Sequence, residues 1–516
     1  MRALHVLLAC LMLPTLASAQ WKEASDATWH PPLRQAPELT TITGVGDLAL
    51  DPAFTANHGY TRFDFNDANS KEDRGLRIVP VPCGLFCTHF LVFGRHKHGS
   101  TWDVVITEIT STGTLVASFG VGGKMQIATP LQWVSDVAVD ASSTHFYFSG
   151  WMKTGGAPDN DFAVVCIDAS GVPCAGFGTL GTVTKWFDLD TNKDDKATRI
   201  LYRPAVGPDP ATLLVGGIAS GGTPAAPSER VGVVAIDPVN GATQASFGSA
   251  GKVVLQVGEV ADLAYVELYD MALSEPSMPG GERLYLAGSF QRAPLANNDI
   301  DGFVMAIDPQ DGSLATSFDG GMVPVHNDIG PPGPSYDAVA GIKVLPDGKV
   351  AMAGQSVDAT LNDQLLLARA TAMDGLDPSF CGGGVCADVL DPGAYIYSAS
   401  IGVRPYTHDL VVAVTESRSS GVPGAPFEQL QVMEQYSASG ITLHGRQEMQ
   451  YPTNGNEAPQ AGVDGLFVGS DFAGGYALMI GTTRWSETSS DYDITAMRTI
   501  ATDEILTSGF GSVDVE

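Results

Sequence analysis

The sequence predicts an all-β protein that folds as a single β-propeller of seven four-stranded antiparallel blades. A short phrase, in which a small residue is followed by Phe and usually by Gly, recurs about every 65 residues. Each interval also contains four short apolar stretches separated by turn residues, and none of them has a helical period. Because units of this size cannot bury a core alone, they must stack against one another.

The Phe phrase marks the end of each repeat unit. It occurs at Phe54, Phe119, Phe177, Phe247, Phe318, Phe380 and Phe510. The last interval is about twice as long as the others, and residues 439–445 are a degraded copy within it. Seven periods therefore run from Phe54 to Phe510. An eight-bladed propeller and a linear β-solenoid are the alternatives.

The unit that ends at Phe380 shows the strand pattern most clearly. Its four predicted strands are residues 322–325, 338–344, 350–354 and 364–370. Residues 346–349 form a tight turn in which Gly348 supplies the positive φ. A Gly ends the third strand in all units but the sixth, at Gly94, Gly150, Gly217, Gly288, Gly354 and Gly481. The mostly apolar stretches after the Phe phrase, such as 252–255 and 322–325, are expected to be the innermost strands.

A propeller must close its ring, because an open ring exposes two strand edges. Two segments compete for the same place in the closing blade. One is the C-terminal segment 511–515, and the other is the N-terminal segment 60–64. The pattern leaves both possibilities open.

Residues 1–19 have the features of a secretory signal peptide. Arg2 provides the positive charge, residues 4–16 are apolar, and residues 17–19 are small and precede a cleavage site before Gln20. A lipoprotein signal at Cys10 is disfavoured, because it leaves only a very short apolar stretch. Residues 20–37 are then an extended N-terminal segment, and residues 38–516 are the propeller, which is expected to be periplasmic or secreted. No later segment is apolar over about 18 residues, so no further membrane span is expected.

The chain is strongly acidic. It contains 28 Lys and Arg against 58 Asp and Glu, which gives a formal net charge of −30 at pH 7. Such a surface repels nucleic acid and anionic lipid, and it attracts cations or cationic partners. It also keeps an exported protein soluble, and we expect a monomer.

Beyond Cys10, six Cys remain, and they form three close pairs. These pairs are Cys83/Cys87, Cys166/Cys174 and Cys381/Cys386. An even number in an exported chain indicates disulfides. Because the pairs lie in different repeats, they do not supply the four ligands of a shared zinc site.

Four segments share a longer pattern around the Phe phrase. They are residues 345–354, 376–380, 50–54 and 118–124. This pattern resembles the delta-60 repeat of bacterial exported proteins, and the resemblance covers roughly residues 45–511. It is strongest in the fifth unit and weakest in the sixth. It implies a propeller fold and export, but no general activity.

The usual catalytic phrases are absent. The sequence contains no Gly-x-Ser-x-Gly elbow, no Gly-x4-Gly-Lys phosphate loop and no His-Glu-x-x-His. The close pair His96 and His98 is flanked by Arg95 and Lys97, which disfavour a bound cation, so a solvated loop is expected. No cofactor is expected to be required.

The best local motif for a metal is the acidic stretch 188–195. The oxygens of Asp188, Asp190, Asn192 and Asp194, with Asp195 following, resemble the first half of a calcium-binding loop. Lys193 replaces the usual Gly, and Arg199 stands where a bidentate acid is expected. An Asx-rich turn is therefore the alternative, and residues 64–69 have a similar composition.

An Asp also begins the predicted fourth strand of five units, at Asp103, Asp161, Asp301, Asp363 and Asp493. A ring of carboxylates would suit a cationic partner. A residue repeated in register more often bonds to the backbone at a strand end, and we favour that structural role.

We therefore expect an exported, non-enzymatic propeller that binds a protein or a glycan through long loops at 220–230, 291–298 and 418–426. One alternative is an enzyme with a site in the central channel, such as a calcium-dependent hydrolase or a quinone-dependent dehydrogenase. The apolar innermost strands disfavour it. Another alternative is a structural cell-surface module. Converging carboxylates and His in the channel would favour the enzyme.

Overall fold

The computed structural model describes residues 41–501, except for 47, 56–58, 66–69, 82–86, 156–158, 224–225, 259–264, 292–299, 328–335, 358–362, 389, 391–392, 406, 420–426, 441–442, 451–459, 472–473 and 485–491. The predicted signal peptide and the segment 20–37 lie outside the described residues. Within them, the regular structure is β-strand apart from one 3-10 turn, η1 (Asp319–Gly321). The prediction of an all-β chain is confirmed.

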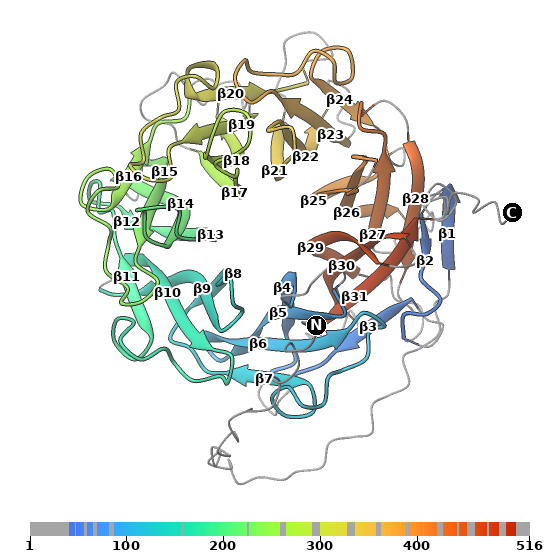
Figure 1. The fold of residues 1–516 in the computed structure, drawn as a ribbon, viewed down its shortest axis with the longest axis horizontal. Helices are drawn as coiled ribbons and strands as arrows, with labels where there is room; N and C mark the ends of the chain where they lie inside the picture. Colours follow the sequence, from blue (N-terminus) through green and yellow to red (C-terminus); the bar gives the residue numbers. More distant parts are fainter. Residues whose placement is uncertain are drawn as a thin grey trace, which may run out of the picture. The chain divides into compact units, whose positions relative to one another are not determined.

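The first three sheets follow one another along the chain (Figure 1). The first contains β4 (Asp73–Pro80), β5 (His89–His98), β6 (Thr101–Thr110) and β7 (Lys124–Ile127). The second contains β8 (Trp133–Val139), β9 (His145–Lys153), β10 (Asp159–Asp168) and β11 (Thr182–Lys185), and β12 (Lys193–Asp194) pairs with β10. The third contains β13 (Lys196–Arg203), β14 (Thr212–Thr223), β15 (Ala226–Ile236) and β16 (Lys252–Leu255). Each set of four is antiparallel throughout.

The next sheet has eight strands and consists of two such sets. The first set is β17 (Val266–Leu273), β18 (Leu284–Gln291), β19 (Ile300–Ile307) and β20 (Met322–Val325). The second set is β21 (Tyr336–Val344), β22 (Val350–Val357), β23 (Asp363–Ala370) and β24 (Val385–Asp388). A single parallel bridge between Ile300 and Tyr336 links them.

The last two sheets recruit strands from the beginning of the chain. The strands β25 (Tyr395–Val403), β26 (Leu410–Ser419), β27 (Phe427–Tyr436) and β28 (Leu443–Gln450) carry β1 (Thr41–Gly46) at their outer edge. The strands β29 (Gln460–Asp471), β30 (Gly474–Arg484) and β31 (Tyr492–Ala501) are completed by β2 (Leu48–Leu50) and β3 (Tyr60–Phe63), which both pair with β31. The N-terminal candidate for ring closure is thus paired, whereas residues 511–515 lie outside the described part of the chain.

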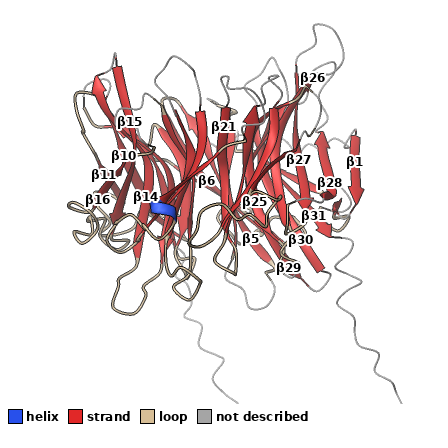
Figure 2. Ribbon diagram, turned by 90° about the horizontal axis from the view of Figure 1, so that it is seen from above, coloured by secondary structure: helices blue, strands red, loops and turns tan. Residues whose placement is uncertain are grey.

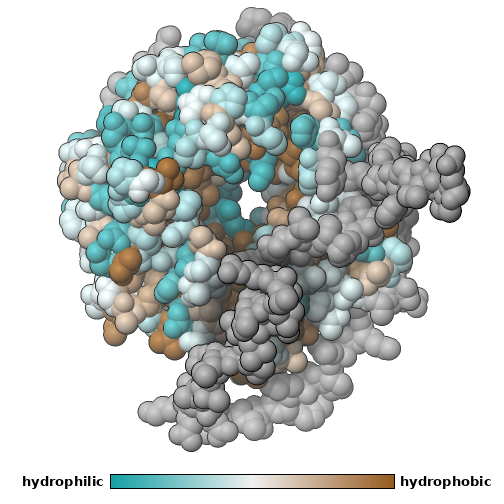
Figure 3. All heavy atoms as spheres, in the orientation of Figure 1, coloured by the Kyte–Doolittle hydropathy of each residue, from teal (hydrophilic) through white to brown (hydrophobic). Residues whose placement is uncertain are grey.

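The sheets stand around a central opening, as in β-propellers (Figures 1 and 3), and Figure 2 shows the strands from the side. The strand of each set that faces this opening is its first, namely β4, β8, β13, β17, β21, β25 and β29. The expectation that residues 252–255 and 322–325 are innermost was wrong. They are β16 and β20, the outer edges of their sets, because the Phe phrase is followed by the last strand of a set and not by the first strand of the next.

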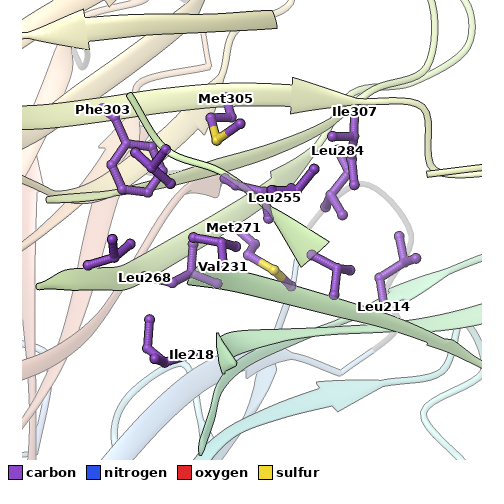
Figure 4. Packing of buried hydrophobic residues seen from close by; sticks show 14 of the residues in the cluster. Leu214, Ile218, Val231, Leu255, Leu268, Met271, Leu284, Phe303, Met305 and Ile307 are labelled. Carbon is purple, nitrogen blue, oxygen red and sulfur yellow. The ribbon is translucent and has the colours of Figure 1, made fainter. Parts of the chain in front are cut away.

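The hydrophobic core lies between neighbouring sets. Figure 4 shows one such layer, in which Leu214 and Val231 from one set pack against Leu268, Met271 and Phe303 of the next. All five side chains are buried. Burying apolar area between sets stabilises the stack in the way that a repeat protein requires.

The Phe phrase joins consecutive sets. Phe54, Phe177, Phe247, Phe318 and Phe380 are fully buried. In these five copies, the residue after Phe has a positive φ and its N–H donates to a turn carbonyl of the following repeat, for example from Gly178 to Asn240 and from Gly248 to Asp311. A left-handed conformation favours Gly, which explains why Gly usually follows Phe.

Candidate functional site in the central channel

The first strand of every set contains a β-bulge at the same depth of the ring. The bulged residues are Leu76, Ser135, Thr198, Tyr269, Ala340, Tyr397 and Asp464. A bulge adds a residue to one strand and redirects its side chains. Here it brings the bulged residue, or the one after it, to the wall of the channel in all seven strands.

A Gly on the second strand lies against most of these bulges. A Cβ on Gly150 would lie 1.8 Å from the carbonyl oxygen of Trp133, and a Cβ on Gly354 would lie 1.8 Å from that of Ala338. No side chain fits at such a distance, which explains the Gly that recurs near the end of this strand. In β26 the equivalent position is Glu416, which pairs with Ile396 and whose Oε2 accepts a hydrogen bond from Nη2 of Arg446 at 3.0 Å.

The residue after the bulge is charged in the four sets from β4 to β20. In the first pair, Nε and Nη2 of Arg77 donate to the two carboxylate oxygens of Asp136 at 3.0 and 2.8 Å. Oδ2 of Asp136 also accepts the N–H of Ile200 at 3.1 Å, in the next set. Asp136 therefore ties three consecutive sets together with charge-assisted hydrogen bonds.

The second pair repeats this arrangement farther along the ring. Nε of Arg199 lies 3.5 Å from Oδ1 of Asp270, and Oδ2 of Asp270 accepts the N–H of Ile342 at 2.9 Å. Burial raises the pKa of Asp270, and Arg199 offsets part of this effect. The described charges thus alternate in sign around half of the channel wall.

The channel has a volume of about 690 Å³. The side chain of Lys343 is exposed and lines the channel. Desolvation within the channel lowers the pKa of its amine. Asp464 is the bulged residue of β29 and accepts a hydrogen bond from the Thr482 hydroxyl at 2.6 Å. Desolvation raises the pKa of Asp464 to about 6, against the opposing effects of Thr482 and Arg95.

Three tyrosines meet on the side of the channel formed by β17 and β21. The hydroxyl of Tyr269 lies 3.1 Å from that of Tyr265 and 3.5 Å from that of Tyr336. Desolvation raises the pKa of Tyr269 and of Tyr336, and that of Tyr336 rises to about 12. The hydroxyls of Tyr269 and Tyr336 are therefore neutral hydrogen-bonding groups at physiological pH.

A ladder of cations and aromatic rings lies near the channel. The guanidinium of Arg95 is 3.7 Å from the ring centre of Trp133, which stacks on Trp151 at 5.6 Å. Nζ of Lys196 lies 5.9 Å from the ring of Trp151. Both faces of Trp133 are therefore occupied, and the ladder braces three sets.

The predicted calcium loop engages the protein itself. Asp188 bonds Lys193 at 3.1 Å, Asp190 accepts the N–H of Gly222 at 3.0 Å, and Asp194 bonds Asn160 and Lys196. Asp195 is buried and accepts the N–H groups of Phe187, Asp188 and Ser220, and the largely buried Asn192 donates its own N–H to Gly222. These contacts are those of an Asx-rich turn, and calcium binding at Asp188, Asp190, Asn192, Asp194 and Asp195 stays a prediction.

His96 does not lie in a solvated loop, and that expectation was wrong. It ends a buried part of β5, and its Nδ1 lies 2.7 Å from Oδ1 of the buried Asp73. His98 is exposed. The two residues share a face of the strand, but β4 pairs with β5 only as far as His96, opposite Asp73, and His98 lies beyond that pairing.

The recurrent Asp of the third strand in each set is buried at all five positions. Oδ2 of Asp363 accepts the N–H of Ile396 in the next set at 3.0 Å, and Oδ2 of Asp103 accepts Gln126 at 2.9 Å. Asp493 forms an ion pair with Arg62. These contacts favour the structural role.

Within the described residues, one group of three carboxylates could hold a metal ion, formed by Asp64, Asp73 and Asp493. Cationic groups are already close, since Nζ of Lys124 donates to the carbonyl oxygen of Asp64 at 2.6 Å and Arg62 pairs with Asp493. The pKa of Lys124 is lowered by burial despite these carboxylates. Asp73 and Asp493 are buried and Asp64 is exposed, so the group is a partly buried ionic junction between the closing set and the first.

Two predicted disulfides are present in the structure. Cys166 and Cys174 have Cα atoms 5.4 Å apart, and Cys381 and Cys386 have Cα atoms 5.7 Å apart. Cys87 is disulfide-bonded, whereas Cys83 lies outside the described residues. Both resolved bridges brace the segment that carries a Phe phrase.

The charged residues of the channel were not among the residues predicted from the sequence. The sequence does contain a pattern that could have identified them. Charged residues occupy equivalent places in four consecutive repeats, namely Arg77, Asp136, Arg199 and Asp270. The predicted loop at 220–230 was also wrong in part, since β14 and β15 extend through it as a hairpin up to Thr223 and from Ala226.

No family model matches the chain, and no curated protein is similar to it in sequence. Among solved structures, Semaphorin 2a of Drosophila is 6% identical with a TM-score of 0.43, over 85% of this chain and 75% of that one. The β-propeller domain of the Trilobed protease from Pyrococcus furiosus is 8% identical with a TM-score of 0.32, over 75% and 98%. The GH32 β-fructofuranosidase of Bombyx mori is 10% identical with a TM-score of 0.31, over 88% and 95%. These likenesses carry no argument about function, and the description of the fold rests on this chain's own strand pairing.

Proposed function

We propose that the protein is an exported β-propeller of seven blades that binds a protein or a glycan through one face and catalyses no reaction. The blade count is supported by the strand order, because the eight-stranded sheet consists of two four-stranded sets and β2 and β3 together complete the last set. Export is supported by the two disulfides. In the described residues, no helix has the length and apolar character needed to cross a membrane.

Three bridges define the face that we propose for binding, called here the loop face. At each bridge, the start of the third strand of one set lies beside the residue that begins or just precedes the first strand of the next set. The bridged pairs are Asp159–Lys193, Ile300–Tyr336 and Glu72–Tyr492. Both kinds of connection, within a set and between sets, therefore emerge at one edge of the ring. The opposite edge carries tight turns, such as the one at 345–349.

The observation that supports binding is the position of the exposed aromatic side chains. Among the described residues, the aromatic side chains most exposed to solvent are Trp186 at 52%, Tyr395 at 45% and Tyr397 at 62%. Trp186 lies in a connection between sets, and the two tyrosines begin β25, so all three belong to the loop face or the channel entrance. Exposed Trp and Tyr present a flat apolar surface with a polar tip, which suits sugar rings and protein side chains.

The test is binding to a glycan array and to identified proteins of the exported fraction. The variants Trp186→Ala and Tyr395→Ala should lose binding, whereas Leu180→Ala, which truncates an exposed residue in a Phe-phrase turn, should retain it. Failure to bind any protein or glycan, together with turnover in a hydrolase and dehydrogenase screen, would replace this proposal by the enzyme alternative.

One observation favours that alternative. The sequence suggested an apolar channel, but Asp136, Asp270 and Asp464 line it. Two of these carboxylates are engaged by Arg side chains and by backbone N–H groups, which suits a structural role. Membership of the delta-60 repeat family is proposed from the sequence pattern alone.

A further inference from the structure

The charge of the channel differs in sign from that of the chain. The protein carries a formal net charge of −30. The cationic residues that line the channel are Arg77, Arg95, Arg199 and Lys343, and the acidic residues are Asp136, Asp270 and Asp464. A positive excess at the centre of an acidic protein focuses anions into a cavity with low-dielectric walls.

Several donors of these cations remain available. Arg77 uses Nε and Nη2 on Asp136, so its Nη1 has no hydrogen-bond partner among the described residues. Arg199 donates Nη1 to the carbonyl oxygen of Thr198 and directs Nε toward Asp270, which leaves its Nη2. Each guanidinium is thus held in place while one amino group stays available for a ligand.

The ammonium group of Lys343 makes no hydrogen bond or ion pair within the described part of the chain, and the side chain is exposed in the channel. It interacts electrostatically with Asp270 and Arg77, which places the three groups around the same space. An ammonium group without a partner is a ready anion site, because it can donate three hydrogen bonds.

The opposite half of the ring leaves room for a ligand. At the level where four sets carry Arg or Asp, the remaining three carry Gly341, Ser398 and Gly465. The cavity of about 690 Å³ lies within the range of small-molecule sites. Tyr336 and Tyr397 line it as well, so a ligand would meet aromatic surface and hydroxyl groups beside the cations.

We propose that the central channel binds a small organic anion, with a carboxylate or phosphate group held by Lys343, Arg77 and Arg199. A sugar acid or a sugar phosphate has the size and the mixture of polar and apolar surface that this wall accommodates. Tyr397 lines this site as well as the channel entrance, but Trp186 and Tyr395 do not line it, and the proposal does not depend on what the loop face binds.

The experiment is isothermal titration of the whole protein with glucuronate, glucose 6-phosphate and glucose as the neutral control. Both anions should bind and glucose should not, and their relative affinities distinguish a carboxylate ligand from a phosphate ligand. Lys343→Met should weaken the binding of the anions about tenfold or more, the effect of one charged contact. Lys153→Met removes an exposed Lys of β9 that does not line the channel and should change nothing.

A second variant tests the same site with the opposite sign. Asp464 is faced by the Thr482 hydroxyl, by Arg95 and Arg74, and by the N–H of Gly75. Replacing it by Asn removes a negative charge, so Asp464→Asn should tighten glucuronate binding at pH 7. In the wild-type protein, binding should tighten as the pH falls through about 6, and the variant should lose this dependence. Absence of binding of both anions at millimolar concentration, or equal affinities of wild type and Lys343→Met, would overturn the proposal.

Discussion

Replacing Asp136 by Ala tests whether the charged ring of the channel holds the sets together. The substitution removes two hydrogen bonds from Arg77, of 3.0 and 2.8 Å, and one from the N–H of Ile200, of 3.1 Å. The Asp136 side chain is 4% exposed and Ile200 is fully buried, so water does not readily replace the lost acceptor. Arg77 is 33% exposed and regains part of its hydration.

The two losses set the expected magnitude. A buried N–H that loses its acceptor costs about 1–3 kcal/mol, and an ion pair with a partly exposed member contributes about 0–1 kcal/mol. The free energy of unfolding of Asp136→Ala should therefore fall by about 1–4 kcal/mol. Asp136→Asn keeps an acceptor oxygen for Ile200 and should cost less than half of this.

Guanidinium-induced unfolding followed by far-ultraviolet circular dichroism measures the effect as a lower midpoint at unchanged slope. Asp347→Ala is the matched control, because that side chain is 57% exposed on a turn. A double-mutant cycle with Arg77→Ala isolates the pair. A change within about 0.5 kcal/mol of the wild type for Asp136→Ala, the range of ordinary surface substitutions, would refute the interblade role.

Four further predictions follow from other parts of the structure. Gly354→Ala should destabilise the fold by about 1–3 kcal/mol in the same assay, since the new Cβ meets the Ala338 carbonyl, whereas Gly383→Ala has open space and should not. Non-reducing peptide mapping should find the three predicted Cys pairs bonded, and six free thiols would contradict this. Millimolar calcium should raise the melting temperature if the acidic loop binds it, and Asp190→Ala should abolish the shift; an unchanged melting temperature would make the loop a turn only. Burial opposes ionisation of Asp140, but hydrogen bonds from His145, Thr144 and Ser142 lower its pKa to about 2, so its contribution to stability should be lost as the pH falls from about 4 to about 2, and Asp140→Asn should lack this loss in acid-unfolding curves.

Much of the architecture was accessible from the sequence because its signals are local. The Phe phrase and the Gly turn of the next repeat predict the period, and the structure joins them by the bond from Gly248 to Asp311. The order of strands within a set was not accessible in the same way. A periodic pattern defines the length of a repeat but not where the chain crosses from one sheet to the next, so β16 and β20 were assigned to the wrong edge.

The channel could be predicted even less. Arg77 and Asp136 lie in different repeats, and each resembles an ordinary surface charge in its own strand. Only the ring brings equivalent positions together and gives them a shared environment. The acidic loop shows the complementary difficulty, because a local pattern of Asp residues suits a calcium ion and is satisfied equally well by backbone N–H groups such as that of Gly222.

The pairing of β3 with β31 has a consequence for the order in which the molecule is assembled. Tyr60 finds its partner Met497 only after almost the entire described chain has been synthesised. β3 is therefore among the first strands to be made and among the last to be placed. Until it pairs with β31, the edge of β31 is open and the face of the first set that packs against the closing set is uncovered. Such edges promote association between chains during folding. The formal net charge of −30 makes copies of the chain repel one another while the ring is still open, which opposes such association.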